Sequence, residues 1–83
     1  MANDFHYVYI LVSTAHPDRH YTGRTTDLDE RLHAHNSGQC PHSRKFRPWR
    51  VETAIALCSE ERAIAFERYL KSHSGRAFAS RHF

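Results

Sequence analysis

The chain has 83 residues, two cysteines and a formal net charge of +3, with 12 Lys and Arg against 9 Asp and Glu. This length predicts one domain, residues 1–83, and the mildly basic balance suits a polyanionic partner without establishing one. The few cysteines argue against a disulfide-rich secreted protein. The longest apolar run, residues 7–12, is too short to span a bilayer, and no signal-peptide pattern opens the chain. We therefore expect a cytoplasmic protein without membrane contact.

Three segments predict strands. Residues 5–12 (FHYVYILV) are aromatic and β-branched on both faces, which is typical of a central strand. A turn at residues 13–18 separates them from residues 19–23, which predict a short second strand in a hairpin with the first. Residues 51–58 (VETAIALC) predict a third strand.

Two segments predict helices. The first begins at a cap in residues 26–27 and ends at Gly38, a natural C-terminal signal. The second begins at Ser59 and runs to Gly75, followed by a last turn or short helix in residues 76–83. The order β-β-α-β-α, with a possible further helix, predicts an α/β (α+β) fold in which helices flank a small antiparallel sheet of three strands.

Both predicted helices turn charged residues toward the core. Helical spacing places Arg31 and His35 on the same face as two leucines, and it places Glu67 among apolar residues of the second helix. Tyr9 and Tyr21 on the strands add hydroxyls that need partners when buried. Two interpretations stay open: a buried ion pair between Arg31 and Glu67, or a solvent-open site where the arginine binds phosphate and the carboxylate holds a divalent metal.

Residues 39–50 form the most basic loop. Its charged and aromatic residues are Arg44, Lys45, Phe46, Arg47, Trp49 and Arg50. Such a mixture is typical of a surface that binds a nucleic-acid backbone and stacks a base. It is equally typical of a solvated loop that Trp49 anchors to the core.

The motifs then resemble a known family. VYI at residues 8–10 and YTG at residues 21–23 are similar to the two halves of the GIY-YIG nuclease signature. The similarity continues at Arg31, at His35-Asn36, and in AFERYLKS and SGRAF of the second helix region. The similarity extends over nearly the whole chain, and the members that the chain resembles are small single-domain bacterial proteins. We therefore expect no separate DNA-recognition domain.

The resemblance implies a fold and a chemistry. The family fold is a three-stranded antiparallel sheet flanked by helices, and the family reaction is metal-dependent hydrolysis of a DNA phosphodiester, here with Mg²⁺ or Mn²⁺. Tyr9 matches the first-motif tyrosine, while Tyr21 and Gly23 match the second motif. Arg31 matches the helix arginine and Glu67 the single metal-ligand glutamate.

His35 matches a position where members carry tyrosine or histidine, and it is placed to assist Tyr9 as the proton acceptor for the attacking water. Two positions depart from the family pattern: Tyr7 stands at a glycine position, and Thr22 replaces an isoleucine.

These observations predict a DNA endonuclease that acts on duplex, branched or single-stranded DNA, specific for structure rather than sequence, in repair or processing. The predicted catalytic residues are Tyr9, Tyr21, Arg31, His35 and Glu67. The predicted DNA-binding residues are Gly23, Arg24, Arg44, Lys45, Arg47 and Lys71. The alternatives are a nucleic-acid-binding module of the same fold with little turnover and a protein-interaction domain; the oligomeric state stays open.

Overall fold

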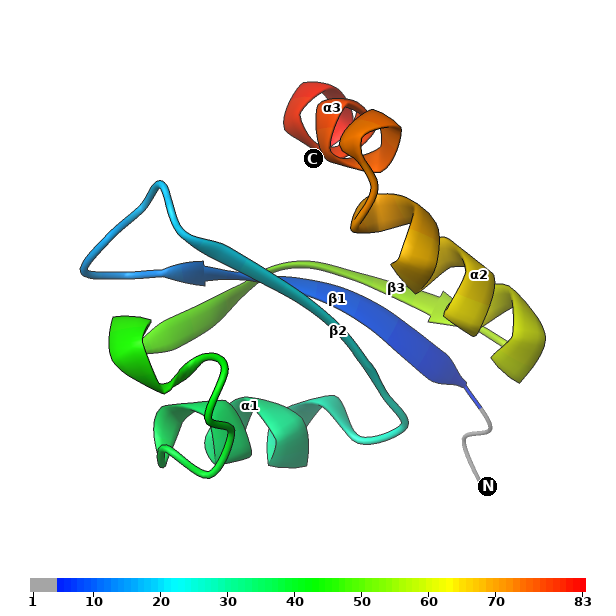
Figure 1. Ribbon diagram of the computed structural model, residues 1–83. Coiled ribbons are helices and arrows are strands. Elements are labelled where there is room, and N and C mark those ends of the chain that lie inside the picture. The colour runs from blue at the N-terminus through cyan, green and yellow to red at the C-terminus, as the bar shows by residue number, and fades with distance from the viewer. Residues whose placement is uncertain (1–4) are drawn as a thin grey trace.

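Strand β1 lies in the middle of the sheet, as its two apolar faces predict. A computed structural model describes residues 5–83 and contains the antiparallel strands β1 (His6–Ser13), β2 (His20–Thr25) and β3 (Trp49–Leu57) in the order β2-β1-β3 (Figure 1). The three predicted strands are thus confirmed, with ends that differ by one or two residues from the sequence prediction.

The two faces of β1 enter two separate parts of the core. Val8 and Ile10 pack with Ala63 and Leu70 on one side of the sheet. Tyr9 and Leu11 pack on the other side with Trp49, which is buried. Alternating side chains on a strand point to opposite faces, so the central strand supplies both parts at once.

Helices cover both faces of this sheet. Helix α1 (Leu28–Asn36) lies on the Tyr9 side, while α2 (Glu60–Leu70) and α3 (His73–His82) lie on the Val8 side (Figure 1). Asp27 caps α1 by accepting a hydrogen bond from Glu30 N at 3.1 Å, as predicted. Within residues 5–83, none of the helices combines the length and the apolar character that a bilayer crossing requires.

The loop between α1 and β3 contains a short 3₁₀ helix, η1 (Arg44–Phe46). The side chain of Asn36, the residue just before the loop, binds the residue just after it. The Asn36 amide accepts from Trp49 N at 2.6 Å and donates to Trp49 O at 3.0 Å. The Trp49 indole donates to Ser43 O at 2.8 Å. These contacts tie the last residue of α1 to the first residue of β3.

The predicted second helix is in fact two helices. Helix α2 ends at Leu70, and Ser72 caps α3 by accepting a hydrogen bond from Gly75 N at 3.1 Å. The prediction that one helix runs to Gly75 is therefore wrong. The physical reason is that the Ser72 side chain caps a new helix, in which Gly75 is buried, so serine and glycine mark a beginning here and not an end.

We predict that Gly75→Ala destabilises the fold at this junction. A Cβ at Gly75 would meet the Tyr69 carbonyl and lie 2.6 Å from Leu70 Cα, both backbone atoms that cannot yield without moving α2. Overpacking of this kind should lower the free energy of unfolding by about 1–3 kcal/mol in urea denaturation. The exposed neighbour Ser74, changed to alanine, should stay within about 0.5 kcal/mol of wild type, and equal effects of the two changes would contradict the close approach.

Candidate functional site

Tyr9 stands at the centre of the candidate site. Its side chain is 2 % exposed, and its hydroxyl lies 2.9 Å from Nε2 of His35. Gly23 is paired with Tyr9 across the β1–β2 ladder, and a Cβ at Gly23 would collide with the Tyr9 hydroxyl. The glycine therefore makes room for the hydroxyl, which gives a physical reason for glycine at the end of the YTG motif.

His35 is held from both of its ring nitrogens. The ring is 1 % exposed, and Nδ1 lies 2.6 Å from Oγ of the fully buried Ser43. Ser43 Oγ donates to the Cys40 carbonyl at 3.4 Å, so it accepts from Nδ1–H, and Nε2 is left to accept the Tyr9 hydroxyl proton. The result is a hydrogen-bond chain from Ser43 through His35 to Tyr9, assigned from the partners of each atom.

Burial keeps both members of the Tyr9–His35 pair neutral. Desolvation, with a smaller contribution from Tyr21, raises the pKa of Tyr9 above its ordinary value, although the charge of Arg31 opposes this. Desolvation also lowers the pKa of His35, and the positive charge of Arg31 lowers it further. A phenolate is therefore expensive at this position, and the imidazole keeps a free lone pair near neutral pH.

Arg31 lies beside this pair with unused donors. Its Nη1 is 3.9 Å from Sγ of Cys40, a weak contact. Its Nε is buried and, among residues 5–83, has no hydrogen-bond partner. A half-buried guanidinium whose Nη1 has only this weak contact is suited to an oxyanion such as phosphate.

Glu67 reaches the site from α2 on the other side of the sheet. Its carboxylate lies 3.6 Å from Arg24 Nε and 3.1 Å from Lys71 Nζ, and it interacts electrostatically with Tyr9. The ion pairs among residues 5–83 include none between Arg31 and Glu67, so the buried-pair interpretation is not what the structure contains.

Tyr21 completes the group of five predicted catalytic residues. Its ring packs edge-on against the His35 ring at 4.7 Å between centroids, and it lies 6.4 Å from the Trp49 ring. It is only partly buried and stands on the edge strand β2. The structure thus brings Tyr9, Tyr21 and His35 into contact, with Arg31 and Glu67 close enough to act on the Tyr9 phenol electrostatically.

The structure corrects the expected exposure of His35 and decides between the two interpretations of Trp49. The solvent-open interpretation places His35 at the border of a cleft, but the residue lies in the interior because it is on the core-facing side of α1, beneath the 39–48 loop. Trp49 is also buried, so it anchors the loop and is not available to stack on a base. The predicted DNA-binding residues Arg44, Lys45 and Arg47 are exposed.

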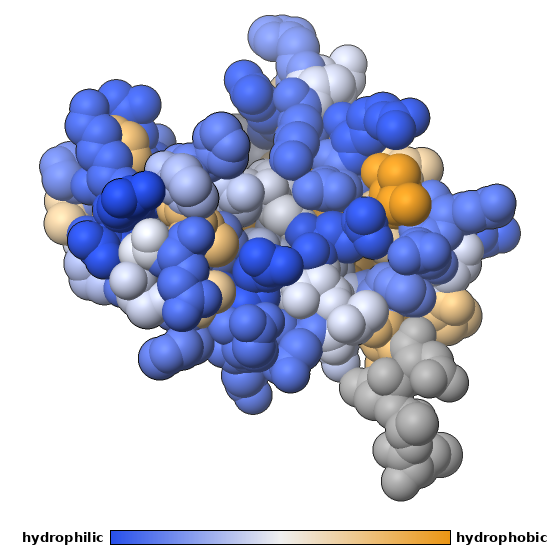
Figure 2. All heavy atoms as spheres, turned by 60° about the horizontal axis from the view of Figure 1, so that its bottom comes forward, coloured by the Kyte–Doolittle hydropathy of each residue, from blue (hydrophilic) through white to orange (hydrophobic). Residues whose placement is uncertain are grey.

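The face of the molecule on the α1 side is mostly hydrophilic, with apolar side chains only scattered over it (Figure 2). Such a face suits a charged, hydrated ligand better than an apolar protein surface.

Sequence reasoning missed Ser43. It sits in QCPHS, a stretch with no recognisable motif, and it becomes important only because the loop folds back over α1 to bring Oγ to His35. The one available signal was the core-facing position of His35 on its helix, because both ring nitrogens of a buried imidazole need partners.

The site offers one carboxylate for a metal. Within residues 5–83, no three His, Cys, Asp or Glu side chains gather in a way that could enclose a metal ion. A hard cation that keeps most of its waters needs only one or two carboxylates and the oxygens of a phosphate substrate. The partly exposed oxygens of Glu67 fit that requirement, with Lys71 as the neighbour that a cation would displace.

Comparison with known proteins agrees with this architecture. The GIY-YIG catalytic domain family matches residues 5–80. The UPF0213 protein BH0048 of Halalkalibacterium halodurans is 39 % identical over 72 residues, which cover 86 % of this chain and 74 % of that protein. The UPF0213 protein HQ_3675A of Haloquadratum walsbyi is 32 % identical over 73 residues, covering 87 % and 80 %.

A solved structure shows the same fold. The solution NMR structure of the UPF0213 protein BH0048 from Bacillus halodurans has a TM-score of 0.55 to this chain at 34 % identity, covering 92 % of this chain and 82 % of that one. The predicted sheet flanked by helices, in the order β-β-α-β-α-α, is confirmed.

We predict that burial of neutral His35 makes stability depend on pH. Because folding lowers the pKa of His35, the unfolded chain binds the extra proton first as pH falls below about 6.5, and the free energy of unfolding decreases there. Urea denaturation between pH 7.5 and 5 should show wild type losing stability faster than His35→Gln. A difference between the two proteins that stays constant with pH would contradict the prediction.

Proposed function

We propose that this chain, which belongs to the GIY-YIG family, is a metal-dependent endonuclease that hydrolyses phosphodiester bonds in DNA. The family implies a nuclease-like fold, a nucleic-acid substrate and a general dependence on metal. One observation carries the proposal for this chain: the Tyr9 hydroxyl is hydrogen-bonded to His35 and lies in the electrostatic field of both Arg31 and Glu67. The substrate is DNA recognised by structure rather than sequence, in repair or processing.

Arg31 binds the scissile phosphate in this proposal. Its Nη1 has only a weak contact with Cys40 Sγ, at 3.9 Å, so the end of the guanidinium can donate to a phosphate, while the Nε is buried. The guanidinium stays charged at any physiological pH, and its position close to Tyr9 keeps the phosphate near the proton acceptor. Its contribution grows as negative charge develops on the phosphate oxygens in the transition state.

Glu67 would hold the metal ion, Mg²⁺ or Mn²⁺. When bound, such an ion stabilises charge on the phosphate and on the leaving oxygen. Lys71 and Arg24 flank the same carboxylate, so they position Glu67 before the substrate arrives. They also offset the repulsion that a carboxylate would otherwise exert on an approaching phosphate.

Tyr9 and His35 move the proton of the attacking water together. The water proton passes to Tyr9 Oη as the Tyr9 proton passes to His35 Nε2, so that no free phenolate forms. This coupling matters because burial makes the phenolate costly and leaves the imidazole neutral. Ser43 fixes the ring tautomer that leaves Nε2 as the acceptor.

The remaining predicted residues have supporting roles. Tyr21, packed on His35 and partly open to solvent, orients the water or the phosphate. Gly23 provides the space that the Tyr9 hydroxyl needs. The exposed cations Arg44, Lys45 and Arg47 on the η1 loop bind the DNA backbone outside the reaction centre.

We predict that Glu67→Gln abolishes cleavage. Labelled duplex, branched and single-stranded DNA should be cut by wild type with Mg²⁺ or Mn²⁺ and not with EDTA. Loss of the metal-binding carboxylate should lower the rate at least about a hundredfold, because a metal contributes several kcal/mol to the transition state. Retained metal-dependent cutting by this variant would overturn the role of Glu67.

Glu60→Gln is the matched control. Glu60 lies on the same helix and also pairs with Arg24, at 3.8 Å, but it is exposed at the start of α2. Its variant should cut at the wild-type rate. If wild type binds every DNA and cuts none, the chain is a nucleic-acid-binding module of this fold instead.

We also predict that Tyr9→Phe separates catalysis from binding. The phenyl ring keeps the packing against Leu11 and Trp49 but removes the proton acceptor. The cleavage rate should fall about 10²–10⁴-fold, while DNA affinity measured in EDTA stays unchanged. Tyr7→Phe, on the same strand, should retain activity. Wild-type rates for Tyr9→Phe would exclude the proton relay.

A further inference from the structure

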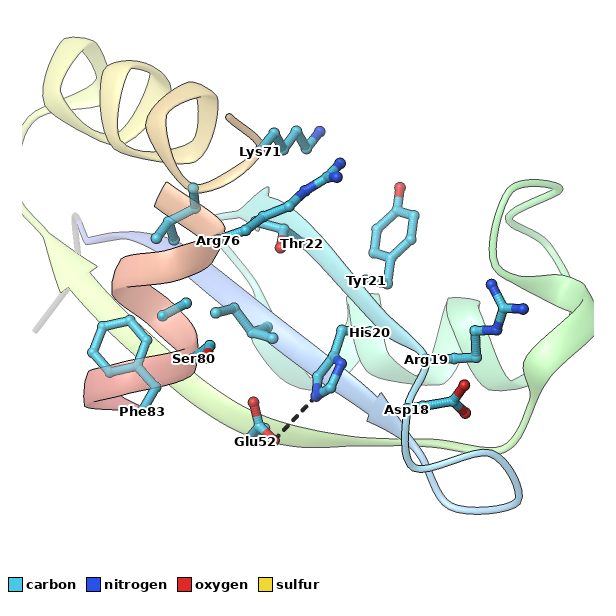
Figure 3. Close-up of a pocket in the computed structure, with 13 residues that line it drawn as sticks. Asp18, Arg19, His20, Tyr21, Thr22, Glu52, Lys71, Arg76, Ser80 and Phe83 are labelled. Atoms are coloured by element: carbon cyan, nitrogen blue, oxygen red, sulfur yellow. Dashed lines mark hydrogen bonds and ion pairs between the residues drawn. The ribbon is translucent and has the colours of Figure 1, made fainter. Parts of the chain in front are cut away.

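A groove that no functional assignment covers lies beside the site, between α3 and the start of β2. Its volume is about 740 Å³, within the range of ligand-binding pockets. Ile10, Leu70 and Ala79 are among its apolar lining residues. A pair between His20 and Glu52 at 3.3 Å lies at its lower end (Figure 3). Tyr21 lines the groove and also contacts His35, so it joins the groove to the candidate active site.

Two cations stand at the rim next to Tyr21. Figure 3 shows the side chains of Lys71, Arg76 and Tyr21 extending to the same side of the groove. Lys71 comes from the end of α2 and Arg76 from the first half of α3, so the junction between these helices brings the charges together. Among residues 5–83, Arg76 forms no ion pair, and it is exposed.

A third cation continues this line toward the η1 loop. Arg19 lines the groove beyond Tyr21, and its guanidinium lies 4.8 Å from the centre of the Phe46 ring. Lys45 approaches the same ring at 5.5 Å. Phe46 therefore links the groove to the basic loop, and the cations lie along the first half of the edge strand β2.

The charges of the groove favour an anion along this edge. Its cations are Arg19, Lys71 and Arg76, against the carboxylates of Asp18 and Glu52. Glu52 is paired with His20 and Lys71 with Glu67, so Arg19 and Arg76 are the cations that remain for a ligand. A row of separated cations matches a ligand with repeating negative charge better than a single phosphate.

We propose that the phosphodiester backbone of one substrate strand runs along the β2 edge, with phosphates bound by Arg76 on one side of Tyr21 and by Arg19 on the other. This inference rests on the proposed function, because Tyr21 places the path next to the scissile phosphate. Arg76 and Arg19 thus become positioning residues for the nuclease: they contact phosphates that neighbour the reacting one, and they extend the basic loop into a continuous binding surface.

The test is the salt dependence of DNA binding in EDTA, where no cleavage occurs. Fluorescein-labelled single-stranded and duplex oligonucleotides are titrated by anisotropy from 50 to 300 mM NaCl with Arg76→Gln and Arg19→Gln. Each substitution should reduce the slope of log K against log salt by about 0.7 on single strands or 0.9 on duplex. The controls are Arg81→Gln on α3 and Arg62→Gln beside β3, which do not line the groove and should leave the slope unchanged.

The outcomes distinguish the proposed DNA path along β2 from the proposed nuclease activity. Unchanged slopes for Arg76→Gln and Arg19→Gln, or equal effects of the controls, overturn the path even if Glu67-dependent cleavage is observed. Reduced slopes for these two variants support the path even if no metal induces cleavage, which would overturn the nuclease function alone. Absence of all DNA binding by wild type at 50 mM NaCl overturns the path as well. Thermal denaturation confirms that each variant is folded.

Discussion

The hydrogen bond between Tyr9 Oη and His35 Nε2 is the contact on which the rest of the site depends. It joins the central strand to α1, and through Ser43 it reaches the loop that follows the helix. All three side chains are at most 2 % exposed, so each polar atom needs a protein partner. The loop must therefore close over α1 for the hydroxyl and the imidazole to be satisfied, and closure in turn fixes their protonation.

The location of the site follows from the layered fold. Tyr9 and His35 lie on the α1 side of the sheet, whereas Glu67 comes from α2 on the opposite side. A single ligand can touch groups from both sides only where the sheet ends. Strand β2 is that edge, and Gly23 leaves there the space that the Tyr9 hydroxyl occupies. The groove lined by Tyr21 opens at the same edge.

Much of this arrangement follows from local patterns in the sequence. The apolar faces of β1 predict a central strand, and the Asp27 cap predicts the start of α1. The inward positions of Arg31, His35 and Glu67 follow from helical spacing alone. The break between α2 and α3 does not, because Ser72 and Gly75 are equally compatible with an ending and a beginning. The roles of Ser43 and Arg76 depend on residues that are distant in the sequence, so no local pattern could predict them.

The amide of Asn36 gives the site a mechanical property. The amide accepts from Trp49 N and donates to Trp49 O, as the backbone of a paired strand would, and so it connects the end of α1 to the start of β3. His35 is the residue just before it, so the imidazole is clamped along the chain as well as through its ring nitrogens. Little reorganisation energy should then be needed when a proton reaches Nε2, since hydrogen bonds already hold the acceptor in place before any substrate binds.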